Sequence, residues 1–216
     1  MVIKTILLSL TAAFLFFSCE STVNVGNREV SNENADTSLL VESYNVIDPV
    51  VNEYLKDELA PIRANFKRIN SIDIKDCSLV LEKELNETSE GGEARFYYWN
   101  SKLEKIVVRR YAETGQSLSE FYLLNGELSF VLERTCNYNR PIYYDSTMMK
   151  ENDDTEAFDP QKAETLEDRS YFSKGKMIHA IASGDCGAPF NQEYLDMEEK
   201  RLKSQLTILT NMVETK

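Results

Sequence analysis

The chain contains a single histidine, His179, among its 216 residues, and this scarcity limits the catalytic sites that it can build. A Ser-His-Asp or Cys-His site would have to use His179, which is predicted to lie in a strand beside Met177 and Ile181, on the face of the sheet that packs on the core. That setting predicts a buried, hydrogen-bonded imidazole. The sequence also lacks a Gly-x-Ser-x-Gly motif, a glycine-rich phosphate loop and any His-rich or paired-cysteine metal spacing. We therefore expect a protein that is not an enzyme and that uses no cofactor or metal.

Basic residues are also scarce, with 24 Lys and Arg against 36 Asp and Glu and a net charge of −12. Binding to nucleic acid depends on clusters of Lys and Arg, so no nucleic-acid partner is expected. The acidic surface either favours a basic protein partner or serves solubility alone.

The apolar run from Thr5 to Phe17 is too short to be a comfortable membrane span. Together with the basic start at Lys4, it predicts a secretory signal. The run ends at Ser18-Cys19, which resembles the lipobox of bacterial lipoproteins, although Phe17 departs from the small residue preferred there. The alternative is an ordinary leader that leaves Cys19 as a thiol.

These features predict three parts of the chain: a lipoprotein signal peptide at 1–18, a lipidated Cys19 with a flexible tether at 19–40, and a single domain at 41–216. The lipid anchor would hold the protein in the bacterial cell envelope, on the periplasmic side of the outer membrane or at the cell surface. The remaining cysteines, Cys77, Cys136 and Cys186, allow at most one disulfide within the molecule, and the sequence leaves its pairing open.

A phrase of aromatic strand end, two-residue turn and new strand occurs three times, at Phe96–Leu103, Phe121–Leu128 and Ser170–Met177. Asn125-Gly126 is the strongest turn, because both residues tolerate the positive φ of a type I′ turn. With a helix starting at Asp48-Pro49 and another after Pro189, the repeats predict an α+β fold. Its sheet would be an antiparallel meander of about seven strands with both helices packed on it, and Pro61 would kink or break the first helix.

Counting outward from the turns assigns side chains to two faces. The predicted core face carries Phe96, Tyr98, Leu103, Val107, Phe121, Leu123, Leu128, Phe130, Leu132, Phe172, Met177 and Ile181. The other face carries Ile106, Val108, Leu124, Val131, Glu133 and a candidate binding set of Arg95, Tyr97, Trp99, Arg110, Glu120, Tyr122 and Tyr171. Either this second face is covered, or its Tyr and Trp beside Arg form a binding site.

The polar segment from Asp145 to Glu167 is acidic, with Asp153, Asp154, Glu156 and Asp159. It lacks the alternating ligand positions and central glycine of an EF-hand loop, so it predicts a solvated insertion in place of a calcium site.

Seven short stretches resemble a group of uncharacterised lipoproteins from Bacteroidetes-type bacteria. They are Arg68–Ile72, Glu90–Ala94, Glu113–Gln116, Leu124–Val131, Tyr138–Pro141, Asp168–Phe172 and Asp185–Pro189. The resemblance implies a cell-envelope context and supplies no catalytic residues.

The sequence thus favours a lipid-anchored envelope protein that binds a protein or glycan partner, plays a structural part or acts as an inhibitor-like module against a basic enzyme. The alternative is a hydrolase that uses carboxylates on envelope glycans or peptides. A concave pocket with clustered Asp and Glu would favour the hydrolase, and a flat aromatic face would favour the binding module.

Overall fold

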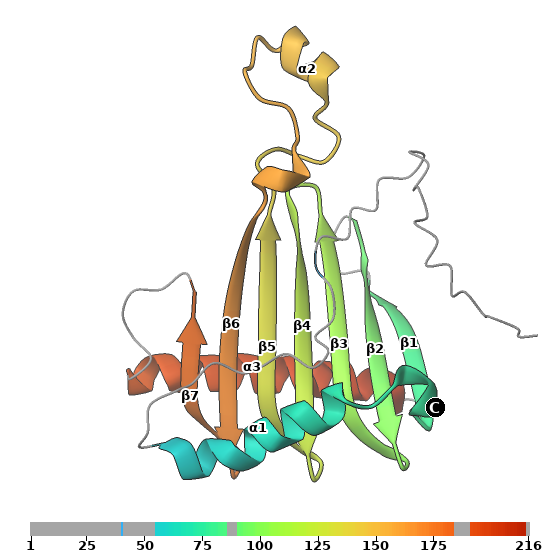
Figure 1. Ribbon diagram of the computed structural model, residues 1–216, viewed down its shortest axis with the longest axis vertical. Coiled ribbons are helices and arrows are strands. Elements are labelled where there is room, and N and C mark those ends of the chain that lie inside the picture. The colour runs from blue at the N-terminus through green and yellow to red at the C-terminus, as the bar shows by residue number, and fades with distance from the viewer. Residues whose placement is uncertain (1–39, 41–54, 86–89, 184–190, 215–216) are drawn as a thin grey trace, which may run out of the picture. The chain divides into compact units, whose positions relative to one another are not determined.

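Figure 1 shows the computed structural model of the protein, which describes residue 40 and residues 55–85, 90–183 and 191–214. The predicted signal peptide, Cys19, Cys186 and the predicted helix start at Asp48-Pro49 lie outside these ranges. Within them, no helix has both the length and the apolar character needed to cross a membrane.

Seven strands form one antiparallel sheet in which each strand pairs with the next along the chain. This order, with a helix from each end of the chain packed on the sheet, confirms the predicted fold class. The strands are β1 (Leu79–Leu85), β2 (Gly92–Trp99), β3 (Lys102–Ala112), β4 (Gly115–Leu124), β5 (Glu127–Asn137), β6 (Glu164–Ser173) and β7 (Lys176–Ala182).

The three predicted hairpins all have tight turns with positive φ at both central residues, at Asn100-Ser101, Asn125-Gly126 and Lys174-Gly175. In the central turn φ is 56° at Asn125 and 85° at Gly126, as a type I′ turn requires. The first two residue pairs beyond this turn also match the predicted register.

One extra residue follows shortly after each turn and forms a β-bulge. In the central hairpin, Leu123 pairs with Leu128 but Tyr122 pairs with Phe130, so Ser129 stands between them without a partner in the register. The equivalent residues are Glu104 in the first hairpin and Ile178 in the third. Each bulge inverts the alternation of side chains along the new strand.

The inversion makes part of the predicted face assignment wrong. Four residues predicted on the core face lie on the tyrosine face instead: Val107, Phe130, Leu132 and Ile181. Conversely, Ile106, Val108 and Val131 pack with Phe96 and Phe121, and the alternation places Arg110 and Glu133 on that side too. His179 is buried, as predicted, but it lies opposite Tyr171 on the tyrosine face.

Helix α1 (Lys56–Asn70) covers the tyrosine face across β4, β5 and β6 (Figure 1). Its stripe of Leu59, Ile62, Phe66 and Ile69 is buried there, as the helical spacing predicts. The helix continues through Pro61, so the predicted break does not occur. Pro61 lies in the second turn, where only one backbone hydrogen bond is lost.

The polar side of α1 is attached to two of the bulges. Asn65 donates from Nδ2 to the Leu123 carbonyl at 2.9 Å and to the hydroxyl of the bulge residue Ser129 at 3.2 Å. One turn later, Arg68 forms an ion pair of 2.5 Å with the bulge residue Glu104. These contacts fix the position of α1 along the hairpin ends.

Helix α3 (Gln192–Glu214) covers the opposite face, behind the sheet in Figure 1. Leu195, Leu202 and Leu209 are buried against a cluster that includes Phe96 and Phe121. Both faces of the sheet therefore belong to the core.

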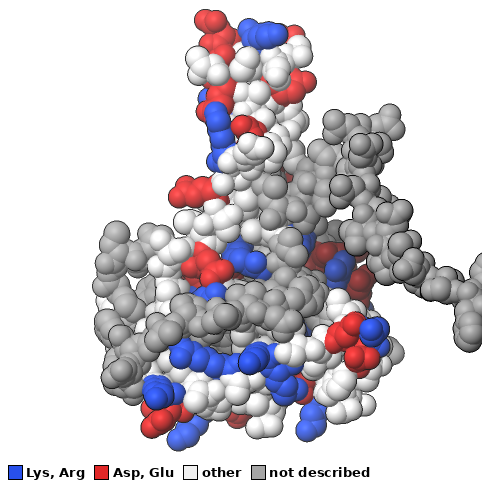
Figure 2. Space-filling view, viewed as in Figure 1, with Lys and Arg blue, Asp and Glu red and all other residues white. Residues whose placement is uncertain are grey.

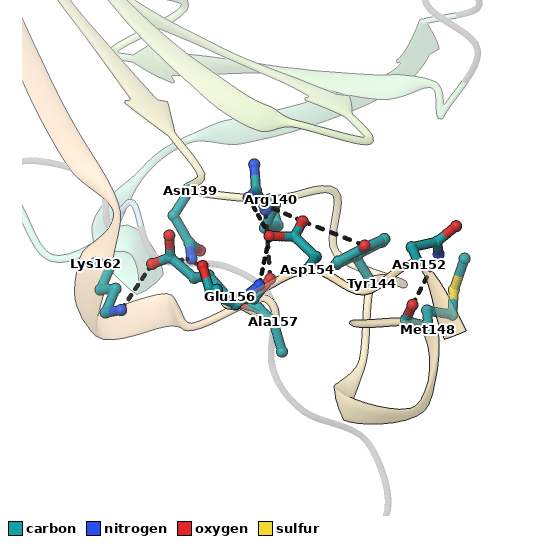
Figure 3. Close-up of polar contacts among 10 residues, drawn as sticks. Asn139, Arg140, Tyr144, Met148, Asn152, Asp154, Glu156, Ala157 and Lys162 are labelled. Atoms are coloured by element: carbon teal, nitrogen blue, oxygen red, sulfur yellow. Dashed lines mark hydrogen bonds and ion pairs between the residues drawn. The ribbon is translucent and has the colours of Figure 1, made fainter. Parts of the chain in front are cut away.

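The insertion between β5 and β6 contains two short helices, α2 (Ser146–Glu151) and η3 (Pro160–Lys162). Its acidic side chains hold the loop together (Figure 3): Arg140 pairs with Asp154 at 2.9 Å, and Lys162 pairs with Glu156 at 2.7 Å. No group of three possible metal ligands comes together in the part of the chain that the structure describes.

A third apolar cluster lies on the tyrosine face beyond α1. It contains Tyr97, Val107, Leu118 and Cys136, and Leu40, the last residue of the predicted tether, packs into it with only 4% exposure. Cys136 is buried and Cys77 is half-buried, and both are free thiols.

Candidate functional site

The three equivalent tyrosines lie on one side of the sheet, as predicted. Through the register, Tyr97, Lys105, Tyr122, Phe130, Tyr171 and His179 form one row across six strands. Tyr122 and Tyr171 are fully buried, with the Phe66 ring of α1 5.0 Å from that of Tyr122. This part of the candidate face is therefore covered by the first helix.

A buried network of charges surrounds Glu120, which is 0% exposed. Its carboxylate pairs with Lys105 at 2.7 Å and with Arg134 at 2.6 Å. The Tyr122 hydroxyl lies 2.7 Å from the same carboxylate and 3.1 Å from Oδ1 of Asn70, at the end of α1. Lys105 Nζ also lies 3.4 Å from that Oδ1, so the network joins three strands to the helix.

The pKa values follow from this arrangement. Burial alone would raise the pKa of Glu120, but the charge and hydrogen bond of Lys105, helped by Tyr122 and Arg134, hold it below its ordinary value. Burial raises the pKa of Tyr122 well above its ordinary value, and the neighbouring Glu120 charge raises it further. Glu120 is thus a carboxylate and Tyr122 a neutral phenol at neutral pH.

A pocket opens at the first hairpin, where α1 has ended. We call it the Trp99 pocket, because its wall contains the only tryptophan of the chain. Its cavity volume is about 30 Å³, and its lining is almost entirely apolar. The lining residues are Ile69, Asn70, Ile72, Ile74, Cys77, Tyr97, Tyr98, Trp99, Glu104 and Lys105.

Asn70 gives this pocket an unusual polar group. The side chain is 4% exposed, and its Nδ2 is buried with no hydrogen-bond partner. An unsatisfied buried donor costs about 1–3 kcal/mol, so such a group calls for a physical explanation. The Nδ2 atom itself has almost no accessible surface, so a ligand in the pocket would not touch it.

The other predicted site residues do not join the pocket. Arg95 shares the tyrosine face but pairs with Glu82 at 3.0 Å and with Glu93 at 3.3 Å. Arg110 lies on the face of α3, because the first bulge inverts its strand. Of the seven candidates, Tyr97 and Trp99 line the Trp99 pocket, while Glu120 supports it from behind through Lys105.

No family model, curated protein or solved structure matches the chain. Function must therefore be argued from the sites themselves.

A second concave site lies on the α3 face. It is a groove of about 350 Å³ lined by Arg110, Ser117, Ser119, Glu133, Arg134, Thr135 and Gln205. Glu133 pairs across the strands with Asp168 and is held at both oxygens by Arg201, at 3.1 and 2.5 Å. Partial desolvation raises the pKa of Asp168, and the Glu133 charge adds to this increase. Glu133 lines the groove, and Asp168 is its cross-strand neighbour outside the lining, so two carboxylates with different environments lie on adjacent strands here.

Charges of both signs are mixed on the face that carries α1. Figure 2 shows basic side chains along α1 and side chains of both signs over the insertion, so much of the acidic excess on this face is balanced locally. The two charged side chains among the lining residues of the Trp99 pocket are both paired, Lys105 with Glu120 and Glu104 with Arg68.

The sequence alone did not identify Asn70, Ile74 or Lys105 as site residues. Asn70 and Ile74 come from a helix end and from the one-turn helix η2 (Ile74–Asp76), and no local motif marks either. For Lys105, the only available signal was its position directly before the apolar run Ile106–Val108. The face to which the Lys105 side chain points depends on the bulge at Glu104.

The network predicts that Glu120→Gln will lower the free energy of unfolding by about 3–5 kcal/mol at pH 7, because Lys105 and Arg134 lose their buried partner. The folded pKa of Glu120 is lowered, so its stabilisation is complete above the ordinary pKa of about 4.3 and is lost as the pH falls through the folded value. Urea unfolding at pH 7 and pH 3 should show the difference between wild type and variant shrinking in acid. Glu82→Gln, at an exposed ion pair, is the control and should cost under about 1 kcal/mol. Equal losses in the two variants at pH 7 would contradict the assignment.

Proposed function

We propose that this protein is a non-enzymatic binding module of the bacterial cell envelope, anchored through lipid on Cys19, and that it takes its ligand in the Trp99 pocket. The observation that carries the proposal is an apolar pocket walled by Tyr97 and Trp99, whose polar lining side chains Asn70, Glu104 and Lys105 are held by neighbouring residues. Binding pockets combine apolar and aromatic walls with a few fixed polar groups in this way.

The site is also pre-formed. Lys105 and Tyr122 hold Asn70 from one side, and both are fixed in turn by Glu120. Arg68 pairs with Glu104, another residue of the pocket lining. A pocket whose walls are already ordered loses little conformational entropy on binding, so even a small contact area can give useful affinity.

The binding proposal predicts that an envelope component will depend on the pocket for its capture. Immobilised full-length protein in detergent should retain this component from an envelope extract, and Trp99→Ala should lose it. Tyr143→Ala, which truncates a side chain 53% exposed on the insertion, should retain it and serves as the matched control. The same captured set with all three proteins would argue against the pocket as the site.

The anchor predicts a second result. Cys19→Ser should abolish incorporation of labelled palmitate and reduce the share of protein in the membrane fraction, because two or three acyl chains are needed for stable anchoring. Cys77→Ser provides the control, since Cys77 belongs to the folded domain and should leave labelling unchanged. Persistent palmitate labelling of Cys19→Ser would rule out this anchor.

One observation favours a second candidate, the carboxylate hydrolase: Glu133 lines the groove on the α3 face, and Asp168 is its partner on the next strand. In this role Asp168, with its raised pKa, would be the proton donor. The test is release of soluble fragments from purified peptidoglycan. Activity that Asp168→Asn removes and Trp99→Ala leaves intact would favour the hydrolase, and no release by the wild type would eliminate this candidate for that substrate.

A further inference from the structure

We propose that the domain lies with its α1 side on the membrane that holds the lipid anchor, and that exposed cations of α1 and of the first hairpin contact anionic lipid head groups. This inference rests on the proposed anchor at Cys19 and adds a contact that the binding function does not require.

The helices that cover the two faces of the sheet differ in the sign of their net charge. Helix α1 contains four basic and two acidic residues, whereas α3 contains three basic and five acidic residues. Both acids of α1 stand in its first turn, so the chain from 59 to 72 carries Arg63, Lys67 and Arg68 with no acid. Figure 2 shows basic side chains along this helix. In a protein with a net charge of −12, α1 is therefore a local cationic surface.

The outer side of α1 allows close approach of a flat surface. Lys67 is exposed, and Ala60, Pro61 and Ala64 are exposed within the two preceding turns. Residues three and four apart are neighbours on a helix surface, so these small side chains lie beside the lysine. The Lys67 ammonium group therefore extends beyond its neighbours toward any surface that meets the helix.

The cationic surface continues onto the hairpin turns. A groove of about 720 Å³ brings Arg68 of α1 together with Lys102 of the first hairpin. Arg68 is paired with Glu104, and Lys102 is exposed. The half-buried side chains of Leu103 and Leu124 line the same groove. Cations beside apolar surface suit the boundary between lipid head groups and acyl chains, where charge attraction and apolar burial act together.

The tether reaches the domain on this same side. Leu40 is the described residue closest in sequence to Cys19, and it packs with Tyr97 and Val107 on the face that α1 covers. The chain between Cys19 and Leu40 can span at most about 75 Å, because an extended chain covers about 3.3–3.6 Å per residue.

Such a tether makes contact with the head groups an intramolecular event, so even weak attraction can hold one side of the domain on the surface. It favours the membrane over a soluble acidic partner, because the head groups are always within reach. The interaction is local, since the Debye length of about 8 Å at physiological salt screens the acidic residues on the far side of the domain.

Trp99 serves as the reporter, because it is the only tryptophan of the chain and lies opposite Lys102 in the register. The lipidated protein, purified in detergent, is reconstituted into vesicles of phosphatidylcholine alone or of an equal mixture with phosphatidylglycerol. Both preparations contain the same share of a lipid with a nitroxide on its head group. We expect stronger quenching of Trp99 fluorescence in the anionic vesicles. High salt should return it to the phosphatidylcholine level, because the Debye length falls to about 3 Å at 1 M.

Two double variants locate the contact. Lys67→Glu with Lys102→Glu should reduce quenching in the anionic vesicles to the phosphatidylcholine level, since even the loss of two cations weakens docking about thirtyfold. Lys150→Glu with Lys200→Glu changes the net charge equally at exposed positions of the insertion and of α3, and it should be quenched like the wild type. Circular dichroism verifies that both are folded, as expected for exposed positions.

Equal quenching in the two kinds of vesicle, quenching that persists at high salt, or the same loss in both double variants would overturn the docking surface. Flotation of the same samples tests the anchor separately, because an anchored protein floats with phosphatidylcholine vesicles as well. If it does not, the anchor is rejected. Salt-sensitive flotation with the anionic vesicles alone, lost in Lys67→Glu with Lys102→Glu, would then still support the docking surface, and its absence would overturn it.

Discussion

One extra residue after each hairpin turn determines how this sheet meets its helices. If Glu104 paired with Tyr97 in a regular register, without the bulge, Lys105 would point toward α3, and Glu120 would be buried without one of its two cations. A buried carboxylate with too little compensation is strongly destabilising. The bulge is therefore a condition for the charged network, and the network in turn holds Asn70 at the end of α1.

The residues that form the bulges also contact α1. Asn65 binds the bulge at Ser129, Arg68 binds the bulge at Glu104, and Ile178 of the third bulge packs against the apolar cluster under α1. Successive turns of one helix thus follow a repeated irregularity in the sheet. This correspondence explains why α1 crosses the hairpin ends in one defined position.

The sequence was informative where structure is local. Turn residues such as Asn125-Gly126 predicted the hairpins, and the meander followed from their repetition. The bulges could not be recognised, because the strands are apolar on both faces. Runs such as Ile106–Val108 and Phe130–Leu132 place an apolar side chain on both faces in either register. The sequence pattern therefore does not reveal the one-residue shift in register. Tyr97 and Trp99 were found because they belong to a repeat, whereas Asn70 and Ile74 reach the site only through tertiary packing.

The Trp99 pocket lies where a repeated contact is missing. Elsewhere in the aromatic row, side chains of α1 pack on the strand residues, and at Tyr97 they do not. Around Tyr171 and Phe130, the α1 side chains Ile62 and Phe66 leave no space for a water. At Tyr97 the helix has already ended, because Asp73 accepts a hydrogen bond from the Lys75 amide and starts η2 in its place. One further helical turn, about 5.4 Å, would carry an apolar side chain toward Tyr97. The position at which a single helix stops therefore decides whether this face of the sheet is closed or carries a pocket.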